Sequence, residues 1–248
     1  MAEKTIVCIH GLGASKGFFS TLAQTSLAQN NRIIAVDLPG FGDRWTDPVG
    51  DLPITSAAEA LASEVDKMGC QNVVLVGHSL GGAAALLTAT MVSGQVWGLA
   101  SLEGNLVAED CGMSRRLAVA ANLTECASIK TKAIDEAKHS ENPGVRDWAR
   151  DLSKVSPSTL LSYSRELVAL SDGGELLRQF LTGRYRRIYL HGDDYVGHPV
   201  LDRLGSIQVE YIKGASHTNL VGDAPEACAQ ALSQILSQTV DVHGRRPA

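Results

Sequence analysis

The chain alternates short apolar runs with segments of helical length, and this alternation restricts its fold more than any other feature. The runs are rich in β-branched residues and nearly continuous in apolar character, which is typical of strands buried on both faces of a parallel sheet. The expected strands comprise residues 5–10, 32–37, 72–76, 97–102, 187–190 and 209–212, and the clearest helices residues 55–67 and 82–91. The sequence therefore predicts an α/β fold with a mostly parallel, doubly wound sheet.

A last helix is expected from Pro225 onward. Proline suits the first turn of a helix, because the amide hydrogen that it lacks would have no partner there. Asp223 precedes it and is the expected N-cap. Ala231, Leu232 and Ile235 then recur at helical spacing. This pattern predicts a helix with one apolar face.

The alternation is interrupted between residues 104 and 185, where helical patterning continues without a clear strand. A structureless loop of this length would be unusual, so we expect a helical insertion. Ligands bind at the carboxyl ends of the strands in such sheets, and the insertion would lie over those ends. The 248 residues suit one domain with a subdomain. We assign residues 1–103 and 186–248 to the core and 104–185 to a helical cap.

Composition excludes several classes of protein. A net charge of −5 and the lack of a dense basic run argue against nucleic-acid binding. No stretch of about 18 apolar residues is present, and the N-terminus has no signal-peptide pattern, so we expect neither a membrane span nor secretion. The cysteines are odd in number and lack C-x-x-C spacing, which favours reduced thiols in a cytoplasmic protein over disulfides or a zinc site. They are Cys8, Cys70, Cys111, Cys126 and Cys228.

The motif that carries chemistry is Gly77-His78-Ser79-Leu80-Gly81-Gly82. It follows the third expected strand and precedes a helix rich in small residues, which is the context that a G-x-S-x-G nucleophile elbow requires. Glycines two positions either side of the serine let neighbouring backbone approach without a Cβ clash. The turn exposes the serine Oγ, and the N-terminus of the helix favours developing negative charge. Ser79 is therefore the predicted nucleophile.

A second glycine-rich segment, His10-Gly11-Leu12-Gly13, follows the first strand. Such a loop can direct a backbone amide at an oxyanion. By the usual geometry the two donors would be the amides of Leu12 and Leu80, the latter being the residue after the nucleophile. The Asp37-Leu38-Pro39-Gly40-Phe41-Gly42 segment after the second strand makes a tight turn, which we interpret as structural.

The HGLG loop, the DLPGFG turn, the GHSLGG elbow and a late GASH segment occur in the order and spacing of the α/β-hydrolase superfamily, which the chain resembles over residues 4–103 and 186–238. The first strand resembles the family's third, so we expect no antiparallel hairpin before it. The insertion resembles the helical cap of esterases, lactonases and C–C bond hydrolases. By this resemblance His217, within the GASH segment, is the catalytic base.

The resemblance does not decide which acid orients His217. Most of the family places an aspartate three residues past a glycine after the penultimate strand, but this position holds Tyr195, and Asp193 and Asp194 come earlier. A minority, including some lipases and a fungal lactonase, carries the acid at the end of the strand after the nucleophile helix. Glu103 occupies that position here. We prefer Glu103, with Asp194 as the alternative and Asp193 or another acid as the last possibility.

These residues predict a serine hydrolase that cleaves a small, moderately apolar carboxylic ester or lactone through an acyl-enzyme on Ser79. We expect a small-molecule substrate and no cofactor or metal. Two alternatives stay open. One is other chemistry on the same triad, such as a C–C bond hydrolase, a hydroxynitrile lyase or an acyltransferase. The other is a small-molecule receptor built on the hydrolase fold.

Overall fold

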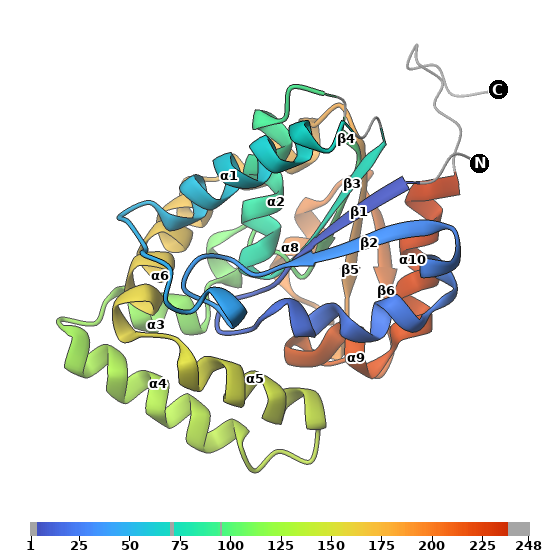
Figure 1. Cartoon of the computed structure of the whole chain (residues 1–248). Coiled ribbons are helices and arrows are strands. Elements are labelled where there is room, and N and C mark those ends of the chain that lie inside the picture. Colours follow the sequence, from blue (N-terminus) through green and yellow to red (C-terminus); the bar gives the residue numbers. More distant parts are fainter. Residues whose placement is uncertain (1–3, 70–71, 95, 238–248) are drawn as a thin grey trace.

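The protein is built on one six-stranded parallel sheet. The computed structural model describes residues 4–69, 72–94 and 96–237, and Figure 1 shows their arrangement. The strand order is β2-β1-β3-β4-β5-β6, and every neighbouring pair is parallel. The strands are β1 (Lys4–Ile9), β2 (Asn31–Val36), β3 (Val73–His78), β4 (Val96–Leu102), β5 (Arg186–His191) and β6 (Gln208–Tyr211). Each expected strand is present, with its ends displaced by at most two residues.

Alternate side chains of each strand enter two separate hydrophobic layers. Val7 and Ile9 of β1 face one layer, and Ile6 and Cys8 face the other. The first layer is covered by α1 (Pro53–Lys67) and α2 (Leu80–Met91). The second layer is covered by η1 (Lys16–Gln24), η2 (Ser26–Gln29), α9 (Leu220–Asp223) and α10 (Pro225–Ser237). Both faces of the sheet are therefore buried, and the predicted doubly wound fold is confirmed.

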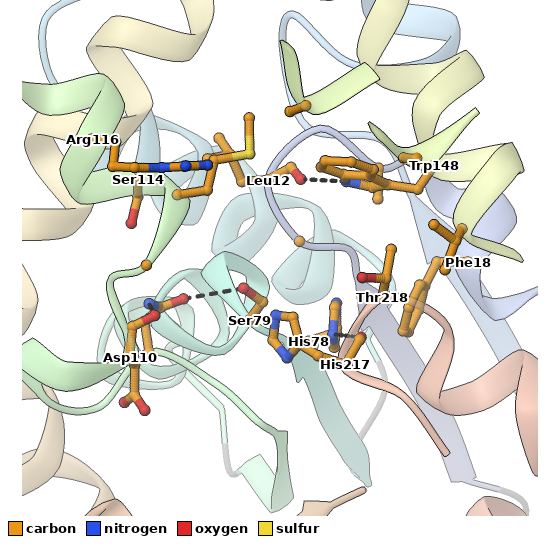
Figure 2. A pocket seen from close by; sticks show the side chains of 18 of the residues that line it. Leu12, Phe18, His78, Ser79, Asp110, Ser114, Arg116, Trp148, His217 and Thr218 are labelled. Atoms are coloured by element: carbon orange, nitrogen blue, oxygen red, sulfur yellow. Dashed lines mark hydrogen bonds between the residues drawn. The ribbon is translucent and has the colours of Figure 1, made fainter. Parts of the chain in front are cut away.

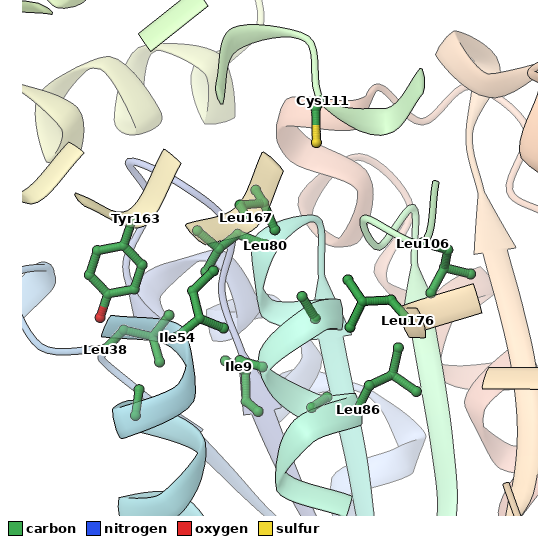
Figure 3. Close-up of a cluster of buried hydrophobic side chains, with 14 of the residues drawn as sticks. Ile9, Leu38, Ile54, Leu80, Leu86, Leu106, Cys111, Tyr163, Leu167 and Leu176 are labelled. Atoms are coloured by element: carbon green, nitrogen blue, oxygen red, sulfur yellow. The ribbon is translucent and has the colours of Figure 1, made fainter. Parts of the chain in front are cut away.

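The segment between β4 and β5 is helical, as expected. It comprises η4 (Ala108–Asp110), α3 (Met113–Ala118), α4 (Leu123–Ala137), α5 (Pro143–Lys154), α6 (Pro157–Asp172) and α7 (Glu175–Thr182). Helices α6 and α7 extend the first hydrophobic layer, where Tyr163, Leu167 and Leu176 pack in one cluster with Leu80 (Figure 3). Helices α4 and α5 lie side by side at one end of the molecule (Figure 1).

One expected feature of the last helix is wrong. Helix α10 begins at Pro225, but Asp223 closes the preceding short helix α9 and does not cap α10. Its Oδ2 accepts hydrogen bonds from the backbone N (2.9 Å) and the Oγ (2.7 Å) of Ser216. The Asp223 carboxylate therefore fixes the loop that holds His217, a role that the local helix pattern does not reveal.

Two further observations bear on the expected class of protein. No helix in the described part of the chain is long and apolar enough to cross a bilayer. Cys8, Cys111, Cys126 and Cys228 are buried and free of disulfides, whereas Cys70 lies outside the described residues. The remaining short elements are η3 (Gly42–Arg44), η5 (Asp193–Tyr195), α8 (Pro199–Arg203) and η6 (His217–Asn219).

Candidate active site

Ser79 occupies a sharp turn between β3 and α2. Its backbone has φ 52° and ψ −121°, a conformation that L-residues rarely adopt. The glycines of the motif are required by close packing: a Cβ on Gly77 would lie 2.2 Å from the carbonyl oxygen of Gly81, and a Cβ on Gly81 would lie 2.1 Å from that of Ile9. The serine is thus presented at the end of its strand, with helix α2 directly behind it.

His217 and Glu103 form a hydrogen-bonded pair beside this turn. The Nδ1 of His217 lies 2.5 Å from Oε2 of Glu103, whose side chain is fully buried. The other carboxylate oxygen, Oε1, accepts a hydrogen bond from the backbone N of Gly192 at 2.6 Å. Glu103 also has a positive φ of 46°. This arrangement fixes the imidazole with Nδ1 protonated and leaves Nε2 available as a base.

The two aspartates after β5 bind backbone and a tyrosine hydroxyl instead of the imidazole ring. Asp194 Oδ2 accepts a hydrogen bond from the backbone N of His217 at 2.7 Å. Asp193 Oδ1 accepts from the Tyr211 hydroxyl at 2.7 Å and from the backbone N of Gly214 at 3.1 Å. Both residues therefore hold the loop that carries His217. Of the candidate acids, only Glu103 contacts the ring nitrogen among the hydrogen bonds of the described chain.

Sequence reasoning missed Asn105 as a member of this site. The Ser79 Oγ donates to Asn105 Oδ1 at 3.3 Å, and the backbone N of Asn105 donates to the Ser79 carbonyl at 3.2 Å. Its Nδ2 donates to the Asp110 carbonyl at 3.0 Å, which fixes the amide with Oδ1 toward the serine. Asn105 lies two residues beyond Glu103, at a strand end next to that of β3, and this position was the available signal. In this structure the hydroxyl must rotate away from Asn105 to meet His217.

The loop that carries Leu12 contacts the elbow that carries Leu80. The loop after β1 passes so close to the elbow that a Cβ on Gly11 would lie 3.0 Å from the Ser79 Cβ. Leu12 lines the pocket beside Ser79, and Leu80 begins α2 with its side chain in the core (Figures 2 and 3). Buried His10 holds this loop: its Nε2 accepts from the Leu38 amide at 3.1 Å, and its Nδ1 donates to the Gly11 carbonyl at 2.8 Å.

The ring of His78, the last residue of β3, contacts the rings of both Phe18 and His217. Its ring stacks on Phe18 with centroids 4.1 Å apart, and its Nε2 donates to the His217 carbonyl at 2.9 Å. Burial, followed by the charge of His217, holds the pKa of His78 well below its ordinary value. The ring is therefore neutral at physiological pH, and no second positive charge opposes a proton on His217.

One cluster in the described residues has the composition of a metal site. Donor atoms of His78, Glu103 and His217 lie within 4.8 Å of one another. Two contacts explain this spacing: the Glu103 carboxylate binds His217 Nδ1, and His78 Nε2 binds the His217 carbonyl. Since each side chain already has a protein partner, the cluster is accounted for as a hydrogen-bonded network.

Ser79 and His217 line a cavity of about 740 Å³ (Figure 2). Its floor comes from the loops after the strands, and its walls come from the insertion. The lining includes Phe18, Met113, Ala133, Val145, Trp148 and Leu167 as apolar groups, and Ser114, Arg116, Glu136, His139 and Thr218 as polar ones. The cavity is therefore bounded both by the loops after the strands and by the insertion.

The sequence pattern of the alpha/beta hydrolase family matches residues 6–231, which include the whole sheet apart from the first residues of β1. The chain belongs to the alpha/beta hydrolase family. The match covers the elbow, the glycine-rich loop and the GASH segment, so the resemblance of the motifs is confirmed at the level of the family.

Individual members of the alpha/beta hydrolase family match shorter segments. A segment of 87 residues is 39% identical to the abhydrolase domain-containing protein abhd-5.2 of Caenorhabditis elegans and covers 34% of this chain and 19% of that protein. A segment of 85 residues is 35% identical to the mouse sn-1-specific diacylglycerol lipase ABHD11 and covers 34% of this chain and 27% of that protein. A segment of 98 residues is 30% identical to the Escherichia coli esterase YbfF and covers 40% of this chain and 37% of that protein. Each match spans well under half of the relative.

Solved structures of alpha/beta hydrolases resemble the whole chain. The N-acyl homoserine lactonase AidH superposes with a TM-score of 0.74 at 18% identity, covering 97% of this chain and 92% of that one. A carboxylesterase structure from the thaumarchaeon Nitrososphaera gargenis gives 0.74 at 15% identity, covering 95% and 90%. At these identities the similarity establishes the fold.

This alpha/beta hydrolase family member buries an acid next to the site. The Oδ2 of Asp110 accepts from the backbone amides of Leu106 (2.7 Å) and Val107 (2.9 Å). Its Oδ1 is buried without a hydrogen-bond partner in the described structure and lies 3.6 Å from His198 Nδ1. Burial raises the pKa of Asp110 to about 6. Asp110 therefore changes charge close to neutral pH.

Asp110→Asn is expected to flatten the pH dependence of stability. Because the pKa in the folded protein, about 6, exceeds the usual 3.8, folding favours the protonated acid. Its stabilising contribution is present below about pH 4 and is lost as the pH rises through about 6. Between pH 4 and 8 the free energy of unfolding of the wild type should fall by roughly 1–3 kcal/mol more than that of Asp110→Asn. Urea unfolding of both proteins at the two pH values measures this, and parallel curves would contradict the raised pKa.

Proposed function

We propose that the chain is a serine hydrolase that cleaves a small, moderately apolar carboxylic ester or lactone through an acyl-enzyme on Ser79. The observation that carries this proposal is the fully buried Glu103 carboxylate bound to His217 Nδ1, beside a serine held at positive φ at the floor of a cavity of about 740 Å³. A nucleophile, a base and a group that orients the base are the elements of acyl transfer by serine.

The first half-reaction transfers the acyl group to serine. The Ser79 Oγ turns from Asn105 toward His217 Nε2, which takes its proton as the oxygen attacks the substrate carbonyl. The resulting oxyanion accepts hydrogen bonds from the backbone amides of Leu12 and Leu80. When the tetrahedral intermediate collapses, the C–O bond to the alcohol breaks. The proton on His217 then passes to the leaving oxygen, so that an alcohol and an acyl-enzyme result.

The second half-reaction releases the acid. Water enters the vacated position, His217 removes one of its protons, and the hydroxyl oxygen attacks the acyl carbonyl. Collapse breaks the bond to Ser79 Oγ, which takes the proton back from His217. With a lactone, the alcohol and the acid are two ends of one product. The Glu103 carboxylate stabilises the imidazolium that forms in each half-reaction.

The relatives favour ester hydrolysis among the chemistries available to such a site. The bacterial relative is named an esterase and the mouse relative a diacylglycerol lipase, and the structural neighbours include a lactonase and a carboxylesterase. We further propose that residues 104–185 act as a cap, since α3, α4 and α5 of this segment supply much of the pocket wall.

A panel of p-nitrophenyl esters of increasing acyl length, beside a panel of lactones, tests the proposed function. We expect release of p-nitrophenol with an optimum at a short or medium acyl chain, with burst kinetics where deacylation is slow. Incorporation of oxygen from labelled water into a carboxylate product distinguishes hydrolysis from acyl transfer to another alcohol. Binding of esters and lactones without turnover of any of them would contradict the proposal and favour a receptor.

Helix α5 joins the insertion to the proposed catalytic loops at two points, its middle and its start. Trp148 Nε1 donates to the Leu12 carbonyl at 3.0 Å, which fixes the peptide plane next to the proposed oxyanion donor (Figure 2). At the start of the helix, Asn142 Nδ2 donates to Asp223 Oδ1 at 2.8 Å, and Asp223 in turn holds Ser216, next to His217. We infer that α5 positions both loops as one unit.

Trp148→Phe is therefore expected to lower kcat by about tenfold. Loss of an oxyanion donor itself costs on the order of 10²–10³ in kcat, and a loosened donor should cost less. Phenylalanine retains an aromatic ring but cannot donate to Leu12. Trp97→Phe is the matched control, because Trp97 Nε1 donates to the Ile235 carbonyl (3.1 Å) away from the pocket. Equal kcat values for the two variants in steady-state assays would count against the positioning role.

A further inference from the structure

Among the described residues that line the pocket, the acids have protein partners and the arginine has none. Three acids line the pocket, and each has a partner. Glu109 receives two hydrogen bonds from Arg203, Asp110 Oδ2 receives two from backbone amides, and Glu136 lies 3.9 Å from Lys132 Nζ. Arg116 also lines the pocket, yet among the hydrogen bonds and ion pairs of the described residues it has none. Within the described structure, Arg116 is therefore a cation of the pocket without a counter-ion.

Arg116 lines the pocket while its side chain stays exposed to solvent. Met113 and Arg116 are three residues apart on α3, so they share a helix face, and both line the pocket. In Figure 2 the Arg116 side chain extends from α3 inward over the pocket. The neighbouring Arg115 turns elsewhere, because its Nη1 and Nη2 bind the Asp172 carboxylate at 3.0 and 2.5 Å. The two arginines of α3 thus have different roles.

We propose that Arg116 binds a carboxylate carried by the substrate at a distance from the scissile bond. This inference rests on the proposed function and narrows its substrate class to acidic esters or lactones, such as monoesters of dicarboxylic acids. A guanidinium presents paired N–H donors that match the two oxygens of a carboxylate, and the apolar side chains of Met113 and Ala133 line the same pocket. The apolar lining would hold the chain that joins the two ends.

The first test compares p-nitrophenyl monoesters of dicarboxylic acids with methyl-ended esters of equal chain length, from adipate upward, with the Ser79→Ala rate subtracted as background. In the wild type we expect the carboxylate-ended substrate to have a kcat/KM about tenfold higher at one favoured length. In Arg116→Gln the ratio of the two kcat/KM values should fall about tenfold, and Arg116→Lys should restore part of it. A ratio near one at every length would overturn the proposal.

Arg115→Gln is the matched control. It removes the same charge one residue away, but from a side chain bound to Asp172 and not from the pocket lining. Its ratio should stay within about twofold of the wild type, because long-range electrostatics changes little when one exposed charge is removed in physiological salt. Equal losses in Arg115→Gln and Arg116→Gln would mean that net charge, and not a contact at Arg116, sets the preference.

Binding to Ser79→Ala separates this inference from the proposed function, since it requires no turnover. Calorimetry with monomethyl and dimethyl esters of the favoured dicarboxylic acid should give about tenfold tighter binding of the monomethyl ester. The additional replacement Arg116→Gln should remove that difference. Tighter binding of the monomethyl ester that depends on Arg116, without hydrolysis by the wild type, would uphold the anion site and reject the hydrolase. Equal binding of both esters would reject the anion site.

Discussion

Replacing Ser79 with alanine is expected to abolish ester hydrolysis, with a fall in kcat on the order of 10⁶. The reason is that Ser79 supplies the hydroxyl at the elbow beside the His217–Glu103 pair, and its hydrogen-bond partner Asn105 is an amide that cannot take over as nucleophile. Alanine occupies the same strained turn as serine, so the free energy of unfolding should change little. Steady-state hydrolysis of the preferred p-nitrophenyl ester measures the loss.

Ser101→Ala provides the control for this experiment. Ser101 is fully buried on β4, the strand next to the elbow, and its Oγ has no hydrogen-bond partner in the described structure. Removal of this hydroxyl should leave kcat within about twofold, since an unsatisfied buried group contributes no interaction to lose. Substantial turnover by Ser79→Ala, with Ser101→Ala unchanged, would show that the hydrolysis proceeds without a serine acyl-enzyme.

Glu103→Gln is expected to lower kcat/KM on the order of 10⁴. The Glu103 Oε1 accepts from the Gly192 amide, so the glutamine oxygen would take that place and its NH₂ group would face His217. The imidazole would then have to accept at Nδ1 and carry its proton on Nε2. In this tautomer it cannot take the proton from Ser79, which is why a nearly isosteric change should be so damaging.

Asp194→Asn is the matched comparison, because it also converts one carboxylate to an amide near His217. Its oxygen can still accept from the backbone N of His217, so the loop should keep its place. We expect a loss of at most about tenfold, from a weaker hydrogen bond to a neutral acceptor. A loss on the order of 10⁴ in Asp194→Asn with none in Glu103→Gln would reverse the assignment of the acid.

The sequence by itself determined the strands and the elbow. Both are local features: a continuous apolar run specifies a strand buried on both faces, and the close approach of backbone around Ser79 admits only glycine at positions 77 and 81. The family follows from these local motifs in their order. For the same reason the helical nature of the segment between β4 and β5 could be predicted from its length and pattern.

Other features were decided only by the tertiary structure. Glu103 and Asp194 both follow strands whose carboxyl ends lie on one edge of the sheet, and the sequence does not specify which side chain turns toward the His217 ring. The structure places Glu103 against the ring and Asp194 against the backbone. The contact of Asn105 with Ser79 likewise depends on how the ends of β3 and β4 align.

The same reason applies to helix α5 and to Asp223. Helical patterning predicts helices within residues 104–185, but it does not predict that Trp148 would donate to the loop after β1. Nor does the pattern before Pro225 indicate that Asp223 would bind Ser216 instead of capping α10. Local sequence fixes which element forms because the relevant contacts lie within a few residues. Which side chains meet across elements depends on the packing of the whole chain, and this packing assembles the candidate site.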